Sequence, residues 1–256
     1  MSTTTRKQQI RDLLKSIETG DSAPVAVVNP DKYIQHNPET HEGGEGLAAL
    51  FKRLSKTSPH VNIVRAFENG EYIFAHTEYD FATSKIGFEI FRFEEDLVVE
   101  HWDNLQAKPG EPNPSGHTMT DGPTEPSDHD KTHENKELVR AFVDDILVNG
   151  RMDKLTGYFD GDTYTQHNPL IGDGLSGLGA ALEEFAKQGI VMKYDRIHRI
   201  LGEGDFVLAV SEGSLAGNHS SFYDLFRVAD GKIAEHWDTI ETIPPRDQWH
   251  NENGKF

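Results

Sequence analysis

Apolar residues follow two different periods along this chain, and the periods come in the same order in both halves. Near the start, apolar residues are spaced three and four apart, which predicts one face of a helix formed by Ile10, Leu13, Leu14 and Ile17. Residues 138–146 repeat this stripe at the start of the second half. Each half then predicts a further helix, over residues 44–55 and 175–188.

The pattern changes to strands after these helices. Four segments in each half are rich in β-branched and aromatic residues and are separated by turn signals such as Asp230-Gly231. They cover residues 61–67, 71–81, 86–93 and 97–106 in the first half, and 191–201, 206–216, 220–228 and 233–243 in the second. Each half is therefore predicted to be an α+β domain, with about three N-terminal helices packed on a four-stranded, mainly antiparallel sheet.

Two polar motifs occur twice, in the same order. Residues 33–38 (Tyr-Ile-Gln-His-Asn-Pro) return at 164–169 as Tyr-Thr-Gln-His-Asn-Pro, and Glu-His-Trp-Asp at 100–103 returns at 235–238. The two motifs are 65 positions apart in the first half, from His36 to His101, and 69 apart in the second, from His167 to His236. The chain is therefore a tandem duplication, with a first domain over 1–106, a linker over 107–130 and a second domain over 131–256.

The predicted linker has five Pro and three Gly and shows no apolar period. This composition indicates an extended segment, which could wrap across a domain surface. Three histidines lie in it or just after it: His117, His129 and His133. Scattered histidines in such a segment are interpreted as solvated side chains rather than metal ligands.

Charge and composition narrow the range of functions. A net charge of −18 argues against binding to nucleic acid or to an anionic membrane surface. No stretch reaches the roughly 20 apolar residues of a membrane span. The chain has no Cys, which removes thiolate nucleophiles and cysteine-ligated metal sites, and no signal-like apolar segment opens it. A cytoplasmic location is the expectation.

Strand alternation separates the residues of the second motif into two faces. Residues two apart on a strand share a face, so His101 and Asp103 are expected together, with Trp102 on the other side. The same holds for His236 and Asp238. A histidine beside a carboxylate can act as general acid or base near neutral pH. A simple buried, hydrogen-bonded pair is the alternative.

The Asn-Pro step predicts a bend in the first motif, because the residue before Pro is kept out of helical geometry. From this bend His36 and His167 are expected to join the His/Asp pairs, or else to anchor the first helices to the sheet. Two His and one Asp per half could also hold a metal ion, but no compact ligand motif is present, so no metal site is predicted.

The two motifs, together with Asp-Leu-Phe-Arg-Val at 224–228 and Gly-Lys-Ile before the last motif, resemble the SnoaL-like polyketide cyclase family of the nuclear-transport-factor-2-like superfamily. The resemblance covers both halves. It implies a curved sheet wrapped around helices as a cone with a deep, mostly apolar pocket. Members commonly dimerise through their sheets, which implies an internal pseudo-dimer of the two domains and leaves room for a further homo-oligomer.

The resemblance also implies the chemistry: acid/base catalysis without metal or organic cofactor on a small, largely apolar carbonyl-type compound, as in cyclases, isomerases, dehydratases or hydrolases. A non-catalytic small-ligand-binding or assembly protein is the alternative. Some members carry an Asp three residues beyond the last motif, where this chain has Gln106 and Glu241. An amide cannot accept a proton as a carboxylate does, so in the first domain the prediction moves to Asp103.

The resulting candidates fall into two groups. The predicted catalytic residues are His36, His101, Asp103, His167, His236 and Asp238. The predicted ligand-binding residues are Tyr33, Asn37, Glu89, Trp102 and Gln106 in the first domain, and Tyr164, Asn168, Asp224, Trp237 and Glu241 in the second.

Overall fold

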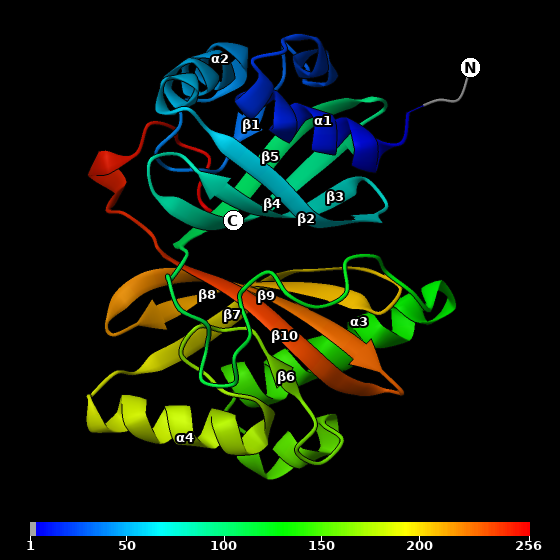
Figure 1. Cartoon of the computed structure of the whole chain (residues 1–256), viewed down its shortest axis with the longest axis vertical. Coiled ribbons are helices and arrows are strands. Elements are labelled where there is room, and N and C mark those ends of the chain that lie inside the picture. Colours follow the sequence, from blue (N-terminus) through cyan, green and yellow to red (C-terminus); the bar gives the residue numbers. More distant parts are fainter. Residues whose placement is uncertain (1–3) are drawn as a thin grey trace. The chain divides into compact units, whose positions relative to one another are not determined.

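The computed structural model describes residues 4–256, which divide into two compact units. The first unit comprises residues up to 107 together with 243–256, and the second comprises residues 108–242. Each unit contains one five-stranded sheet with helices on one face (Figure 1). The predicted α+β class, with helices packed on a mainly antiparallel sheet in each half, is confirmed.

The first unit begins with helix α1 (Arg6–Thr19). The Thr5 side chain accepts a hydrogen bond from the Gln8 N–H, and Gly20 ends the helix in the left-handed region. Helix α2 (Gly43–Leu54) follows the first polar motif. The sheet has the order β1-β5-β4-β3-β2. Its strands are β1 (Ile34–Gln35), β2 (His60–Asn69), β3 (Tyr72–Asp80), β4 (Ser84–Glu94) and β5 (Leu97–Ala107).

The second unit repeats this order. Helix α3 (Thr132–Phe142) continues as a π-helical turn over Val143–Val148, and α4 (Gly174–Lys187) is the counterpart of α2. The sheet order is β6-β10-β9-β8-β7. Its strands are β6 (Thr165–Gln166), β7 (Met192–Glu203), β8 (Phe206–Leu215), β9 (Asn218–Ala229) and β10 (Lys232–Thr242).

The short strands β1 and β6 were not predicted, and they decide which residues of the first motif face the helices. Strand β1 pairs in parallel with β5, with Gln35 opposite His101. Strand β6 pairs in the same way with β10, with Gln166 opposite His236. The glutamine therefore shares a sheet face with the histidine of the second motif, and the next residue, His36 or His167, turns to the opposite face.

The core of each unit lies between the helices and one face of its sheet. In the first unit Ile10 and Leu13 of α1 pack in one cluster with Ile73 of β3 and Phe93 of β4. In the second unit Val139 and Phe142 of α3 cluster with Val207 of β8 and Phe226 of β9, among others. The helical stripes seen in the sequence are thus the faces that the helices bury.

The segments outside the two repeats are not free linkers. Residues 108–130 belong to the second unit and residues 243–256 to the first, so the predicted linker over 107–130 and the second domain over 131–256 need correction. Polar contacts hold these segments: Asn113 donates to the main-chain oxygen of Gln166, and the Ser127 hydroxyl donates to Asp205. Such contacts leave no apolar period, which is why the sequence pattern missed them.

No helix among residues 4–256 is long and apolar enough to cross a membrane.

Two glycines of helix α4 provide a matched test of its packing. A Cβ on Gly177 would lie 2.3 Å from the main-chain oxygen of Gly172, whereas a Cβ on Gly179 would meet nothing within 4 Å. We expect Gly177→Ala to lower the free energy of unfolding by about 1–3 kcal/mol, because the backbone must move apart. Gly179→Ala is expected to raise it by up to about 1 kcal/mol through helix propensity. Urea denaturation of both variants checks this, and equal effects would contradict the close approach at Gly177.

Candidate active sites

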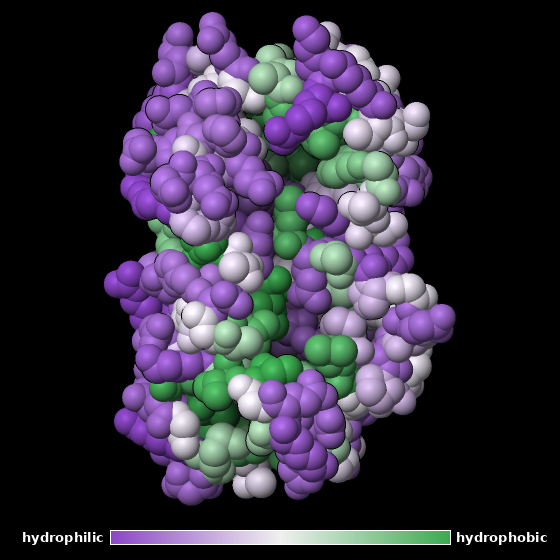
Figure 2. Space-filling model, turned by 90° about the vertical axis from the view of Figure 1, so that its left-hand side faces the viewer, coloured by the Kyte–Doolittle hydropathy of each residue, from purple (hydrophilic) through white to green (hydrophobic). Residues whose placement is uncertain are grey.

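Each unit has a cavity between its helices and its sheet. The first cavity has a volume of about 140 Å³ and the second about 240 Å³. Apolar side chains form most of the walls, including Leu13, Leu47 and Phe51 in the first cavity and Leu178, Phe185 and Met192 in the second. Figure 2 shows apolar side chains gathered at hollowed places on one face of the surface. Leu170, which lines the second cavity, is 64% exposed, so this cavity opens to solvent.

At the base of the second cavity, Gln166 fixes the tautomer of His236. The Gln166 Oε1 accepts hydrogen bonds from the main-chain N–H groups of His167 and Asn168, both at 2.9 Å. It therefore faces the His236 Nδ1, 3.0 Å away, as an acceptor. The Nδ1 atom must carry a hydrogen in this arrangement, which leaves Nε2 to interact with a carboxylate.

Asp224 of β9 is that carboxylate. Its Oδ1 lies 3.0 Å from the His236 Nε2, and the Tyr194 hydroxyl donates to both its oxygens at 3.2 Å. Burial alone would lower the pKa of His236, but the hydrogen bond to Asp224 and the charges of Asp238 and Asp224 outweigh it and raise the pKa. The two carboxylates therefore favour the cationic form of His236, and both of its ring nitrogens are already engaged.

Asp238 of β10 differs from Asp224 because only one of its two carboxylate oxygens has a hydrogen-bond partner among the described residues. Its Oδ2 accepts a hydrogen bond of 2.7 Å from the Asn168 side chain, whereas its buried Oδ1 has no hydrogen-bond partner among residues 4–256. Burial raises the pKa of Asp238 to about 6, and the Asp224 charge adds to this while His236 and Asn168 oppose it. The carboxyl is thus a proton acceptor poised close to neutral pH, on the wall of an apolar cavity.

Tyr164 supplies a donor on the same cavity wall. Its hydroxyl oxygen accepts a 3.0 Å hydrogen bond from the Gln166 Nε2. In the part of the chain that the structure describes, the hydroxyl hydrogen has no acceptor. Burial and the neighbouring carboxylates Asp238 and Asp224 raise the pKa of Tyr164 well above its usual range, so the hydroxyl stays protonated. It can donate to an oxygen of a bound molecule.

The first cavity repeats this chain of contacts with Glu89 in place of Asp224. His101 lies 2.7 Å from Glu89 through Nε2 and 3.0 Å from the Gln35 Oε1 through Nδ1. The Tyr79 hydroxyl donates to Glu89 at 2.9 Å, and the Asn37 side chain donates to Asp103 at 2.6 Å. Burial raises the pKa of Glu89, although His101 opposes the shift.

One contact has no counterpart in the second unit. The Lys255 ammonium, from the segment that follows β10, lies 3.5 Å from the Asp103 Oδ1, and both side chains are buried. Asp103 therefore faces a fixed positive charge, whereas no cation lies on the Oδ1 of Asp238 among the described residues.

The structure brings most of the predicted residues to the cavities. Those that line them are Tyr33, Asn37, Glu89, His101 and Asp103 in the first, and Tyr164, Asn168, Asp224, His236 and Asp238 in the second. Gln106 and Glu241 do not, because their strand neighbours Leu105 and Ile240 occupy the cavity faces. Four further polar residues line the cavities but were not predicted: Gln35 and Tyr79 in the first, and Gln166 and Tyr194 in the second. The repeat of Gln before His in the first motif was the signal for the two glutamines.

The expected position of His36 and His167 in the cavities is wrong. The His167 Nδ1 lies 2.8 Å from the main-chain oxygen of Thr118 and its Nε2 2.8 Å from Glu235, while its ring stacks on Trp237 at 4.7 Å. His36 makes the same set of contacts in the first unit, with Gly254, Glu100 and Trp102. The two-residue parallel strands turn these histidines to the face opposite the cavity. Trp102 and Trp237 lie on that face by alternation along β5 and β10, as predicted.

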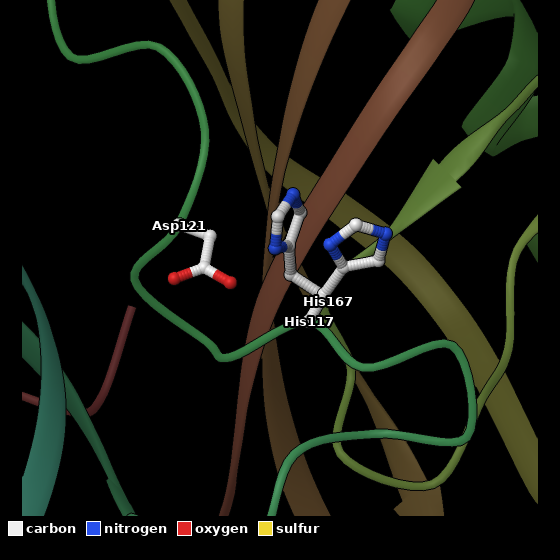
Figure 3. Close-up of side chains that lie close together, drawn as sticks. All are labelled: His117, Asp121 and His167. Atoms are coloured by element: carbon white, nitrogen blue, oxygen red, sulfur yellow. The ribbon is translucent and has the colours of Figure 1, made fainter.

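The predicted solvated role of His117 also needs correction. His117, Asp121 and His167 lie close enough together to hold a metal ion, and Figure 3 shows them gathered beside the segment that follows β5. However, His117 is paired with Asp173 at 3.1 Å and Asp121 is held by Thr118, while both nitrogens of His167 are engaged. His36 makes the corresponding hydrogen bonds in the first unit, with Gly254 and Glu100. We therefore assign His117, Asp121 and His167 to anchoring the segment that follows β5.

The chain is similar to one known domain family and to several solved structures. Residues 139–236 match the family model of the SnoaL-like domain. A search of curated proteins gave no match. Among solved structures, TsrD from Streptomyces laurentii is 21% identical with a TM-score of 0.36, over 41% of this chain and 92% of its own. An LEH-like epoxide hydrolase from M. tuberculosis is 26% identical with a TM-score of 0.33, over 43% and 85% of the two chains.

A third solved structure, an NTF2-like protein of unknown function from Mesorhizobium loti, is 15% identical with a TM-score of 0.35, over 41% of this chain and 98% of its own. The first unit has the strand order of the second and repeats both polar motifs. Residues 139–236 of this chain are therefore a SnoaL-like domain, and the first unit is its internal repeat.

Proposed function

We propose that the second cavity catalyses proton transfer on a small, largely apolar carbonyl compound. Two groups on the lining of a mostly apolar cavity carry this proposal: the buried Oδ1 of Asp238 and the hydroxyl hydrogen of Tyr164, neither of which has a partner among residues 4–256. A base and an oxyanion donor are the two groups that removal of a proton next to a carbonyl requires.

The steps follow from the contacts. The substrate carbonyl accepts a hydrogen bond from Tyr164, which places the neighbouring carbon near Asp238. The C–H bond breaks, its proton passes to the Asp238 Oδ1, and its electron pair moves through the carbon framework to the carbonyl oxygen. Tyr164 stabilises the enolate oxygen, and the protonated Asp238 returns the proton to a carbon of the same molecule. Isomerisation, ring closure and elimination all share this first step.

His236 and Asp224 act behind Asp238 rather than on the substrate. Both nitrogens of His236 are engaged, so it has no site left for a bound molecule. Its positive charge opposes the rise in the pKa of Asp238 that burial causes. Asn168 fixes the Asp238 carboxylate through the Oδ2, which directs the Oδ1 as the acceptor.

A test of this function does not require the natural substrate. The protein is incubated in D₂O with a panel of small cyclic and aromatic ketones, and exchange of the protons next to the carbonyl is followed by NMR. Faster exchange than in buffer, lost in Asp238→Asn, is expected. Exchange that does not exceed the buffer rate for any ketone, although the ketones bind, would leave a binding protein as the better description.

The pH dependence of the exchange follows from the raised pKa of Asp238. Only the ionised carboxylate can accept a proton, so kcat/KM is expected to rise as pH increases through about 6 and to level off above it. Measuring the exchange rate between pH 4.5 and 8 checks this. A rate that is flat across this range, or that falls as pH rises through 6, would contradict Asp238 as the base.

A further inference from the structure

The two cavities differ in charge although their hydrogen-bonded polar residues correspond. Arg53 of α2 and Lys85 of β4 line the first cavity. Neither side chain forms a hydrogen bond or ion pair with another residue in the described range 4–256. In the second cavity the charged lining residues are Asp224, His236 and Asp238, with no Lys or Arg.

The internal repeat shows that these cations are specific to the first unit. Helices α2 and α4 align on their lining residues, Leu47 with Leu178 and Leu54 with Phe185, so Arg53 corresponds to Glu184. Strands β4 and β9 align on Glu89 and Asp224, so Lys85, four residues earlier, corresponds to Ser220. Two positive positions of the first unit are thus an acid and a neutral residue in the second.

Lys255 also makes the surroundings of the first cavity more positive than those of the second. It is 3% exposed, and its ammonium lies 3.5 Å from the one oxygen of Asp103 that has no hydrogen-bond partner. The negative charge of Asp103 is therefore offset from behind, whereas the charge on Asp238 is not offset by a lysine or arginine. The lining of the first cavity also includes the exposed carboxylate of Glu39, so an entering anion meets two cations, Arg53 and Lys85, against this one carboxylate.

We propose that the first cavity binds a small amphipathic anion, an apolar molecule that carries one carboxylate. Its apolar part would lie against Leu13, Leu47 and Phe51, and its carboxylate would pair with Arg53 and Lys85. The proposal refines the proposed function by giving the first cavity a different ligand class from the second. It concerns binding alone, so it stands or falls independently of proton exchange.

The test compares two probes of similar size on the full chain, octanoate and 1-octanol, by isothermal titration calorimetry. Octanoate is expected to bind the wild-type protein more tightly than 1-octanol does, and raising the salt concentration should weaken octanoate alone. Arg53→Gln combined with Lys85→Gln should weaken octanoate about tenfold and leave 1-octanol unchanged. Lys52→Gln, an exposed neighbour on α2 outside the cavity lining, is the matched control and should change neither.

The site is located by a chemical-shift map. Octanoate should perturb the amide signals of residues that line the first cavity, such as Leu47 and Leu105, and not those of Leu178 and Ile240 in the second. Equal affinity for the two probes, an unchanged octanoate affinity in the double variant, or shifts confined to the second cavity would each overturn the proposal. If the wild-type protein binds octanoate as expected but does not speed the exchange of ketone protons, only the proposed function is contradicted.

Discussion

Asp238→Asn is expected to lower kcat/KM for ketone proton exchange by about 10²- to 10⁴-fold, the usual effect of removing a general base. Asn keeps the shape of Asp and can still accept the hydrogen bond of Asn168, but it cannot take up a proton at the Oδ1 position. The measurement is the exchange rate in D₂O with the ketone that the wild-type protein processes fastest.

Stability provides the control, because the same substitution should not weaken the fold. The folded-state pKa of Asp238 is raised to about 6 from its ordinary value of 3.8, so between these values the folded chain holds a proton there that the unfolded chain has lost. The free energy of unfolding therefore falls as pH rises from about 4 to 6, by up to about 3 kcal/mol. Asp238→Asn lacks this loss and should be more stable than wild type at pH 7 and similar at pH 4, as urea denaturation at both pH values can show.

Asp103→Asn separates the two cavities. Asp103 faces Lys255, so it is not the equivalent of a free base, and its replacement should reduce the exchange rate far less than Asp238→Asn. If both cavities were active, each single variant would keep the rate of the intact cavity, so small and similar losses in the two variants would place the reaction in both cavities. Unchanged exchange in Asp238→Asn would remove the second cavity from the mechanism.

Much of the site could be predicted because strands impose a period on their side chains. Alternation along β5 and β10 put His101 with Asp103 and His236 with Asp238 on one face, where they line the cavities. The duplication, visible in the repeated motifs, predicted that both units would carry the same polar chain. The position of Glu89 and Asp224 depended on hairpin register, and they lie opposite Asp103 and Asp238.

The remaining features of the site depend on contacts that follow no periodic pattern in the sequence. The first motif looked like a bend, but two residues of it pair in parallel with the last strand, and this pairing exchanges the glutamine and the histidine between faces. The partners of His36 and His167 come from segments that no apolar pattern marks, at Gly254 and Thr118. A repeated Asn-x-x-Gly, at 113–116 and 251–254, is the trace that these anchoring segments leave in the sequence.

Asn251→Ala is expected to lower the free energy of unfolding by about 1–3 kcal/mol. The substitution leaves the buried Thr40 carbonyl without its side-chain donor and removes one of two donors to the Asn37 carbonyl, which keeps the Thr40 N–H. The Asn251 side chain is 6% exposed and donates to the main-chain oxygens of Asn37 at 2.7 Å and Thr40 at 2.9 Å. Asn113 donates to two main-chain oxygens of the second unit, those of Gln166 at 2.7 Å and Ile171 at 3.0 Å, and Asn113→Ala should have a similar cost.

The two variants should differ in function, because each asparagine holds a different copy of the first motif. Asn113 is bonded to Gln166, whose side chain orients His236 and Tyr164, so Asn113→Ala should slow proton exchange in the second cavity. Asn251→Ala should leave that rate nearly unchanged. Amide hydrogen exchange should show lost protection at residues 35–40 in Asn251→Ala and at 166–171 in Asn113→Ala. Stability equal to wild type in both variants would mean that the segments lie on the units without holding them, since an anchor of two buried hydrogen bonds cannot be removed without cost.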